Sequence, residues 1–256
     1  MLAAIPGWQH ARYRELQGGL TNRSLLVESE DERAVLKIDS APRSRPYNSR
    51  GEEARVQSAA AGIGIAARVL FVDATVFMSE YQEGSVWTRE SLDDENNLVA
   101  LAAVLRRVHS LPLTGRTFDA RAAARLYGEH IDDADPEIVK RCISVVESMP
   151  VPHNLCCCHN DLVAQNVIAT PELKLLDWEY ACDNDPFFDL ATVVAHHELS
   201  TSQADLLLEA YFDGDGQRWR EQLIRQERLY DALHWLWLAA HHADEPALDG
   251  VYERLV

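Results

Sequence analysis

The sequence is poor in lysine and has no long apolar segment. Three of its 24 basic side chains are lysines, 41 side chains are acidic, and the formal net charge is −17. This balance argues against a nucleic-acid-binding surface, which needs clustered Lys and Arg to neutralise phosphates. The longest clean apolar run, residues 98–105, is far shorter than the roughly 20 residues that a membrane-spanning helix needs, so we expect no membrane span.

Cysteine is also scarce, and its arrangement is unlike that of a secreted protein. The chain has five cysteines, an odd number, and three of them are consecutive at 156–158. This is not a disulfide framework. The first ten residues lack a basic region followed by an apolar stretch, so we expect no signal peptide and a cytoplasmic location.

Two further absences exclude kinds of site. The chain contains no Gly-Lys pair, which excludes a P-loop of the Walker type. The run Cys156-Cys157-Cys158-His159 resembles a metal cluster, but consecutive strand residues point to opposite faces, so a buried strand is the expected structure. The adjacent histidine pairs at 196–197 and 241–242 lack a zinc-binding spacing for the same reason.

The charge that is present is unevenly distributed. Residues 1–85 hold 10 basic and 11 acidic side chains, whereas residues 86–256 hold 14 basic and 30 acidic ones. A near-neutral first third followed by an acidic remainder suggests two units with different roles, although acidic surfaces also simply aid solubility.

Short apolar segments and turn residues predict strands in the first 85 residues, and longer amphipathic segments predict helices beyond them. The predicted strands are 13–16, 24–28, 34–38, 67–72 and 75–81, with one helix at 50–61. The predicted later helices begin at 91 and lie near 119–129, 136–148, 187–198, 201–212, 217–242 and 246–255. Three short strands, at 155–158, 167–169 and 174–176, interrupt them. The pattern predicts an α+β fold.

The most informative stretch follows the first of these three strands. Asp161 and Asn166 lie in the run HNDLVAQN, and Asp177 and Glu179 follow a second apolar strand. Asp161 could orient and deprotonate a hydroxyl, while Asn166, Asp177 and Glu179 offer the hard oxygen ligands that suit Mg²⁺. Each residue alone is an ordinary turn residue. Their joint spacing favours a phosphoryl-transfer site.

A matching phosphate-binding half lies near the N-terminus. The run Gly18-Gly19-Leu20-Thr21-Asn22 lies between two strands, where backbone N–H groups and the Thr21 hydroxyl could cover phosphates, although Gly-Gly is usually just a hairpin. Lys37 is placed within an apolar strand and offers a compact point charge for phosphate, or else it is an edge-strand surface residue. Either Glu52 or Glu53 could pair with it.

These residues together resemble the choline/ethanolamine kinase and aminoglycoside phosphotransferase superfamily, whose members are protein-kinase-like. The resemblance rests on the Gly18–Asn22 run, Lys37, HNDLVAQN and LLDWEYACDNDP, in the same order over nearly the whole chain. Bacterial choline kinases and thiamine kinases are the most similar members. The resemblance implies a small β-rich N-lobe at residues 1–80 that binds ATP, and a larger, mainly helical C-lobe at 81–256.

The resemblance also implies roles for individual residues. Asp161 is the expected catalytic base, and Asn166 and Asp177 the expected Mg²⁺ ligands. Lys37, paired with Glu53 rather than Glu52, is expected to hold the α- and β-phosphates of ATP. The other expected ATP-binding residues are Gly18, Gly19, Thr21 and Asn22, with Ser79, Glu80 and Tyr81 as the hinge. His159 and Asp189 are expected to support the catalytic loop.

The acceptor is the least determined part of the prediction. The resemblance places Tyr180, His196, Trp235 and Trp237 near the acceptor, and aromatic faces bind cationic alcohols by cation–π attraction. Trp235 and Trp237 are two residues apart on a predicted helix, so both cannot face one site, and which of them does stays open. His234 and His196 occupy places where choline kinases carry a tryptophan and an acid.

The sequence therefore predicts an enzyme that moves the γ-phosphate of Mg-ATP to the hydroxyl of a small cationic alcohol such as choline, ethanolamine or thiamine. Two alternatives stay open. One is an aminoglycoside or sugar kinase of the same fold, and the other is a nucleotide-binding pseudokinase that acts through a partner. The oligomeric state is not readable from the residues.

Overall fold

Two units make up the chain, and each is built from two separate stretches of sequence. The computed structural model describes residues 2, 5–16, 23–40, 43, 47–241 and 245–255. Unit 1 comprises residues 1–87 and 165–181, and unit 2 comprises residues 88–164 and 182–256. The predicted lobe boundary at residues 80 and 81 stays a prediction.

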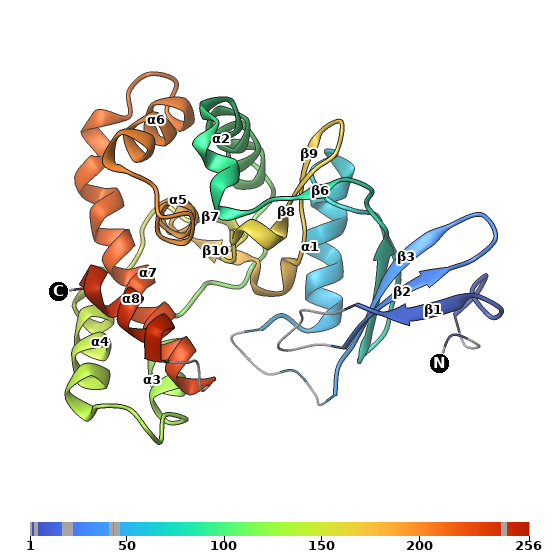
Figure 1. Cartoon of the computed structure of the whole chain (residues 1–256), viewed down its shortest axis with the longest axis horizontal. Helices are drawn as coiled ribbons and strands as arrows, with labels where there is room; N and C mark the ends of the chain where they lie inside the picture. Colours follow the sequence, from blue (N-terminus) through green and yellow to red (C-terminus); the bar gives the residue numbers. More distant parts are fainter. Residues whose placement is uncertain are drawn as a thin grey trace. The chain divides into compact units, whose positions relative to one another are not determined.

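Unit 1 contains a five-stranded antiparallel sheet in the order β1-β2-β3-β5-β4 (Figure 1). Its strands are β1 (Arg12–Glu15), β2 (Arg23–Glu28), β3 (Arg33–Ile38), β4 (Val69–Val72) and β5 (Val76–Glu80). Each corresponds to a predicted strand. In β3 the alternation of side chains buries Ala34 and Leu36 completely, against Leu25, Val27 and Met78. Lys37 therefore lies on the face of β3 opposite to this core.

Helix α1 (Arg50–Gly62) packs against β4 and β5. Ser49 is its N-cap: the Ser49 hydroxyl accepts a hydrogen bond from the Glu52 N–H, and the Glu52 carboxylate accepts one from the Ser49 N–H. This capping box satisfies backbone donors that the first turn leaves unpaired. Glu53, the next residue after Glu52, is buried in the same first turn.

A three-stranded antiparallel sheet, in the order β6-β8-β9, completes unit 1. Its strands are β6 (Ser85–Val86), β8 (Val167–Ala169) and β9 (Leu173–Leu175), flanked by the 3₁₀ helices η3 (Ala164–Asn166) and η4 (Trp178–Tyr180). Val167 is paired with Leu175, and the Leu176 N–H donates to the Asn166 carbonyl at 2.8 Å. The hairpin therefore brings the segments that hold Asn166 and Asp177 to the same end.

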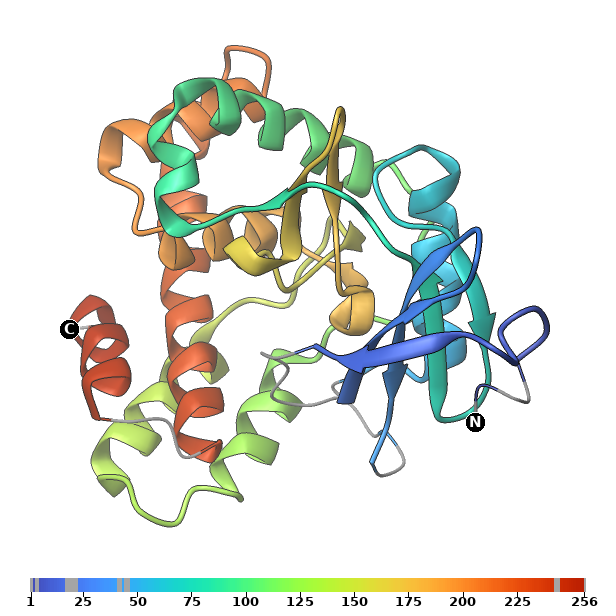
Figure 2. The ribbon, with the colours of Figure 1, turned by 45° about the vertical axis from the view of Figure 1, so that its right-hand side comes forward.

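Unit 2 is mainly helical, and its longest helix, α7, contacts α3, α4, α5 and α8 (Figure 2). The helices are η2 (Arg89–Asp93), α2 (Glu95–His109), α3 (Ala120–Gly128), α4 (Pro136–Ser148), α5 (Pro186–His196), α6 (Thr201–Tyr211), η5 (Gln217–Trp219), α7 (Arg220–Ala240) and α8 (Glu245–Leu255). The helix predicted to begin at Ser91 is two elements, because Asp94 is extended and caps α2.

Two short antiparallel strands in unit 2 support the predicted catalytic loop. Strand β7 (Cys156–Cys158) pairs with β10 (Cys182–Asn184), and Cys158 is opposite Cys182. Cys157, Cys158 and Cys182 are buried. The loop that begins at His159 therefore starts from a fixed, buried strand end.

Across the part of the chain that the structure describes, no helix combines the length and apolarity that crossing a membrane requires.

Candidate active site

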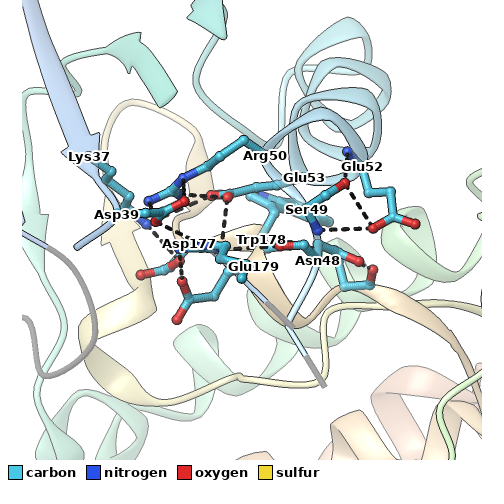
Figure 3. A network of polar contacts seen from close by, with 12 residues as sticks. Lys37, Asp39, Asn48, Ser49, Arg50, Glu52, Glu53, Asp177, Trp178 and Glu179 are labelled. Atoms are coloured by element: carbon cyan, nitrogen blue, oxygen red, sulfur yellow. Dashed lines mark hydrogen bonds and ion pairs between the residues drawn. The ribbon is translucent and has the colours of Figure 1, made fainter. Parts of the chain in front are cut away.

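Lys37 lies beside two of the predicted carboxylates within unit 1. Its Nζ is 2.6 Å from an Asp177 oxygen and 3.9 Å from a Glu53 oxygen, and its side chain is 14% exposed (Figure 3). Burial alone would lower the pKa of Lys37, but the charges of Asp177, Glu53 and Glu179 together raise it above its ordinary value. The lysine is therefore a cation at neutral pH, and it lies next to a candidate metal ligand.

The two candidate partners of Lys37 have different environments. Glu53 is fully buried and lies 2.7 Å from the Arg50 guanidinium, in addition to its contact with Lys37. Glu52 instead accepts hydrogen bonds from the N–H and hydroxyl of Ser49. Burial raises the pKa of Glu53, while Lys37 and Arg50 oppose this rise. The geometry thus supports Glu53 as the partner and assigns Glu52 to the helix cap.

A buried network of ion pairs continues from Glu53. Arg50 lies 2.6 Å from Asp39, and Arg43 lies 2.9 Å from Asp39 and 2.7 Å from Glu179. Sequence reasoning missed Asp39, Arg43 and Arg50, because nothing in their local pattern separates them from surface charges. Together with Lys37, Glu53, Asp177 and Glu179 they place three cations among four carboxylates in unit 1.

Replacing Arg50 with Met is expected to lower the free energy of unfolding by about 3 kcal/mol, because it leaves buried carboxylates short of a countercharge. The Arg50 side chain is fully buried between Asp39 and Glu53. Urea unfolding of both proteins measures the difference. The control is Arg68→Ala, which removes an exposed ion pair with Glu80 and should cost less than about 1 kcal/mol. Equal losses of unfolding free energy in the two variants would show that the buried network stabilises the fold no more than an exposed ion pair does.

The predicted metal ligands are brought together in part. Asn166 and Asp177 lie at the common end of the β8–β9 hairpin, and both offer oxygen donors that suit Mg²⁺. Asp177 adopts a left-handed conformation with φ of 61°, which is uncommon for a residue other than glycine. Glu179 is buried in its ion pair with Arg43, which makes it a weaker candidate for the ion.

In unit 2 the predicted loop support is present. The buried Asp189 carboxylate accepts hydrogen bonds from the His159 N–H at 2.9 Å and the Asn160 N–H at 2.7 Å. It also contacts His109 Nε2 at 3.0 Å. Asn160 has a φ of 64°, and its side chain bonds to Asn184 at 2.8 Å. These contacts hold the backbone immediately before Asp161.

Asp161 itself is half-buried and lies near helix α7. Tyr230 of that helix has a pKa raised above its ordinary value by burial and by the negative charges of Asp161 and Asp231. Asp161 belongs to unit 2, whereas Asn166, Asp177 and Lys37 belong to unit 1.

The residues predicted to meet the acceptor belong to both units. Tyr180 is in unit 1, where its ring lies 4.7 Å from that of Tyr47. Trp235 is buried in the helical core, and Trp237 stacks on His241 with ring centroids 4.4 Å apart.

Two histidines of unit 2 lie in the neighbourhood of Tyr230. His234 lies 5.3 Å from Tyr230 between ring centroids. Burial lowers the pKa of His196 to about 3, with added effects from His197 and His234, and burial lowers that of His234 to about 4. Both imidazoles are therefore neutral at physiological pH. The structure thus groups His196 with His234 and Tyr230.

The remaining predictions concern the nucleotide. In the predicted hinge the Glu80 N–H donates to Arg68 and the Tyr81 N–H to Arg33, while Ser79 pairs with Val35 in the sheet. Adenine binding at this segment stays a prediction. The adenine would have to contact backbone groups other than the N–H groups of Glu80 and Tyr81. The predicted phosphate-binding residues Gly18, Gly19, Thr21 and Asn22 lie outside the described residues.

Comparison with known proteins decides the family. Residues 12–230 match the model of the phosphotransferase enzyme family. The chain belongs to this family. Protein LicA of Haemophilus influenzae is 29% identical over 206 residues, which are 76% of this chain and 61% of that relative's length. The thiamine kinase of Salmonella typhi is 29% identical over 219 residues, covering 83% of this chain and 75% of the relative.

A solved structure shares the fold of this phosphotransferase. The crystal structure of choline kinase LicA from Streptococcus pneumoniae has a TM-score of 0.79 at 22% identity and covers 95% of this chain and 91% of that one. The predicted family, the α+β kinase-like fold with a β-rich N-terminal part, and the prediction of an enzyme of the phosphotransferase class are therefore confirmed.

Proposed function

We propose that this phosphotransferase moves the γ-phosphate of Mg-ATP to the hydroxyl of a small cationic alcohol. The observation that carries the proposal is the 2.6 Å contact between the Lys37 ammonium and the Asp177 carboxylate. It places a cation suited to phosphate oxygens beside a carboxylate suited to a metal ion. Phosphoryl transfer depends on this kind of positioning and charge neutralisation.

Asn166 and Asp177 are the residues that would hold Mg²⁺, since they supply hard oxygen donors at one hairpin end. When bound, the ion offsets negative charge on the phosphates. Glu53 keeps Lys37 in place from helix α1, and Arg43 and Arg50 offset the negative charge of the buried carboxylates around it.

Asp161 is the proposed base. It accepts the proton of the acceptor hydroxyl while the oxygen forms a bond to the γ-phosphorus, the bond from phosphorus to the β–γ bridging oxygen breaks, and ADP leaves with that electron pair. Asp189 positions this base indirectly, because it holds the N–H groups of His159 and Asn160.

The names of two relatives support the proposed acceptor class. One matching relative is a thiamine kinase, and a structure of the same fold is a choline kinase. Both act on cationic alcohols. We propose that the acceptor lies on the side of Asp161 formed by Tyr230, His234 and His196, in place of the predicted tryptophan pair.

Purified protein is expected to consume ATP in the presence of Mg²⁺ with choline, ethanolamine or thiamine, and the product should carry one added phosphate by mass spectrometry. The same panel includes an aminoglycoside and neutral sugars, which should give rates at least about tenfold lower in kcat/KM. Preference for an aminoglycoside or a sugar would support the alternative kinase. Tight ATP binding without consumption on any acceptor would support the pseudokinase.

A further inference from the structure

Cys156 and Cys158 lie on the same face of strand β7, and their sulfurs are close together. The two Sγ atoms are 3.6 Å apart. Neighbouring strand residues point to opposite faces, but residues two apart share a face. The argument from consecutive strand residues therefore sets Cys157 apart, but it does not separate Cys156 from Cys158.

A third donor comes from helix α2. A ring nitrogen of His109 and the two sulfurs all lie within 4.8 Å of one another. Cys156 and His109 are partly exposed, and Cys158 is buried. The three side chains come from two separate elements of unit 2, so the cluster is a product of tertiary packing and not of a local sequence pattern.

The hydrogen bonds of His109 determine which nitrogen has a lone pair. Nε2 faces the Asp189 carboxylate at 3.0 Å, and a carboxylate only accepts, so the Nε2–H tautomer of the imidazole fits this contact. Nδ1 therefore accepts a hydrogen bond from the Tyr211 hydroxyl at 2.6 Å. A histidine that donates one N–H to a carboxylate and offers its other nitrogen is oriented as metal-binding histidines are.

We propose that His109, Cys156 and Cys158 form a site for a thiophilic ion such as Zn²⁺, distinct from the Mg²⁺ site. Tetrahedral zinc with Zn–S bonds of about 2.3 Å places two sulfurs about 3.8 Å apart, close to the 3.6 Å found here. Two thiolates and an imidazole suit zinc and cadmium, whereas the oxygens of Asn166 and Asp177 suit magnesium.

Binding at this site requires two exchanges. The two thiols give up their hydrogen bonds to the Asn184 and Asp185 carbonyls and release their protons to solvent as the sulfurs bond to the ion. The Tyr211 hydroxyl leaves Nδ1 of His109 so that this nitrogen can bond to the ion. The bond from Nε2 to Asp189 is kept. The site therefore forms without loss of the contacts that Asp189 makes with His159 and Asn160.

The test is a titration of the reduced full chain with Cd²⁺, followed by the ultraviolet sulfur-to-cadmium charge-transfer band. Excess Mg²⁺ is present to fill oxygen sites, and no nucleotide is added. We expect saturation at one ion per chain. Cys156→Ser should weaken binding by at least about tenfold, whereas Cys157→Ser, on the opposite face of the same strand, should leave it unchanged.

Two further measurements keep the proposal testable if a variant folds poorly. In the unmodified protein, Zn²⁺ should slow alkylation of Cys156 several-fold, as read by peptide mass spectrometry. Tyr211→Phe should raise the affinity for Cd²⁺, because it removes the hydroxyl that occupies Nδ1. Absence of saturable binding, equal loss in Cys156→Ser and Cys157→Ser, or weaker binding by Tyr211→Phe would overturn the assigned ligands. None of these readouts depends on kinase activity.

Discussion

Replacing Asp161 with Asn is expected to lower kcat by about 100- to 10,000-fold, the range in which general bases contribute. The asparagine side chain keeps the size and hydrogen-bonding capacity of the aspartate, but it cannot accept a proton from an alcohol at neutral pH. The backbone before residue 161 is held by Asp189, so the loop should keep its conformation. Steady-state kinetics with the preferred acceptor measures the change.

The same variant should bind ATP about as tightly as the unmodified protein. Asp161 belongs to unit 2, whereas Lys37, Glu53 and Asp177 belong to unit 1. The matched control is Asp93→Asn, which removes an exposed carboxylate from the same unit. A kcat within about threefold of the unmodified enzyme would show that Asp161 is not the base.

Replacing Asp177 with Asn is expected to remove the dependence of nucleotide binding on Mg²⁺ and to reduce turnover by several hundredfold or more, since a bound metal is worth several kcal/mol of charge stabilisation. The substitution takes away the carboxylate 2.6 Å from Lys37. Asparagine tolerates the left-handed backbone of this position better than alanine does, so the variant should fold. ATP affinity measured with Mg²⁺ and with a chelator gives the result.

The variant Glu179→Gln tests whether Glu179 binds the metal ion or only stabilises the fold. Its carboxylate is paired with Arg43 in the buried network, so this change should lower stability in urea while Mg²⁺ dependence is retained. The opposite result would be a stable Glu179→Gln variant whose nucleotide binding no longer depends on Mg²⁺, with Mg²⁺ dependence kept in Asp177→Asn. Glu179 would then be the metal ligand, and Asp177 would have only a structural role.

The elements of the fold were readable where a strong local pattern marks them. The short apolar segment of β3 and the amphipathic segments beyond residue 85 each indicate an element by themselves, and the structure contains them. The exception is the segment beginning at Ser91. Its apolar spacing predicts one continuous helix. The backbone of Asp94 is extended, however, and its side chain accepts a hydrogen bond from the Asn96 N–H, so a new helix begins after it.

Candidate site residues could be predicted where one short stretch carries several of them. Asn166 directly precedes one strand of a hairpin and Asp177 follows the other, so strand pairing brings the segments of these two residues together. The network of Asp39, Arg43 and Arg50 has no such signal. Arg43 and Glu179 are 136 positions apart, and each alone is indistinguishable from a solvated charge.

The sequence by itself determined the family and the order of most strands and helices, because side-chain type and short-range spacing carry that information. The chemistry that it predicts for Lys37, Asp161, Asn166 and Asp177 is what the experiments above test. Only the tertiary structure paired Glu179 with Arg43 and grouped His196 with His234. It also placed His109 beside the sulfurs of Cys156 and Cys158. These outcomes depend on helix rotation and on contacts between distant segments, and packing of the core sets both.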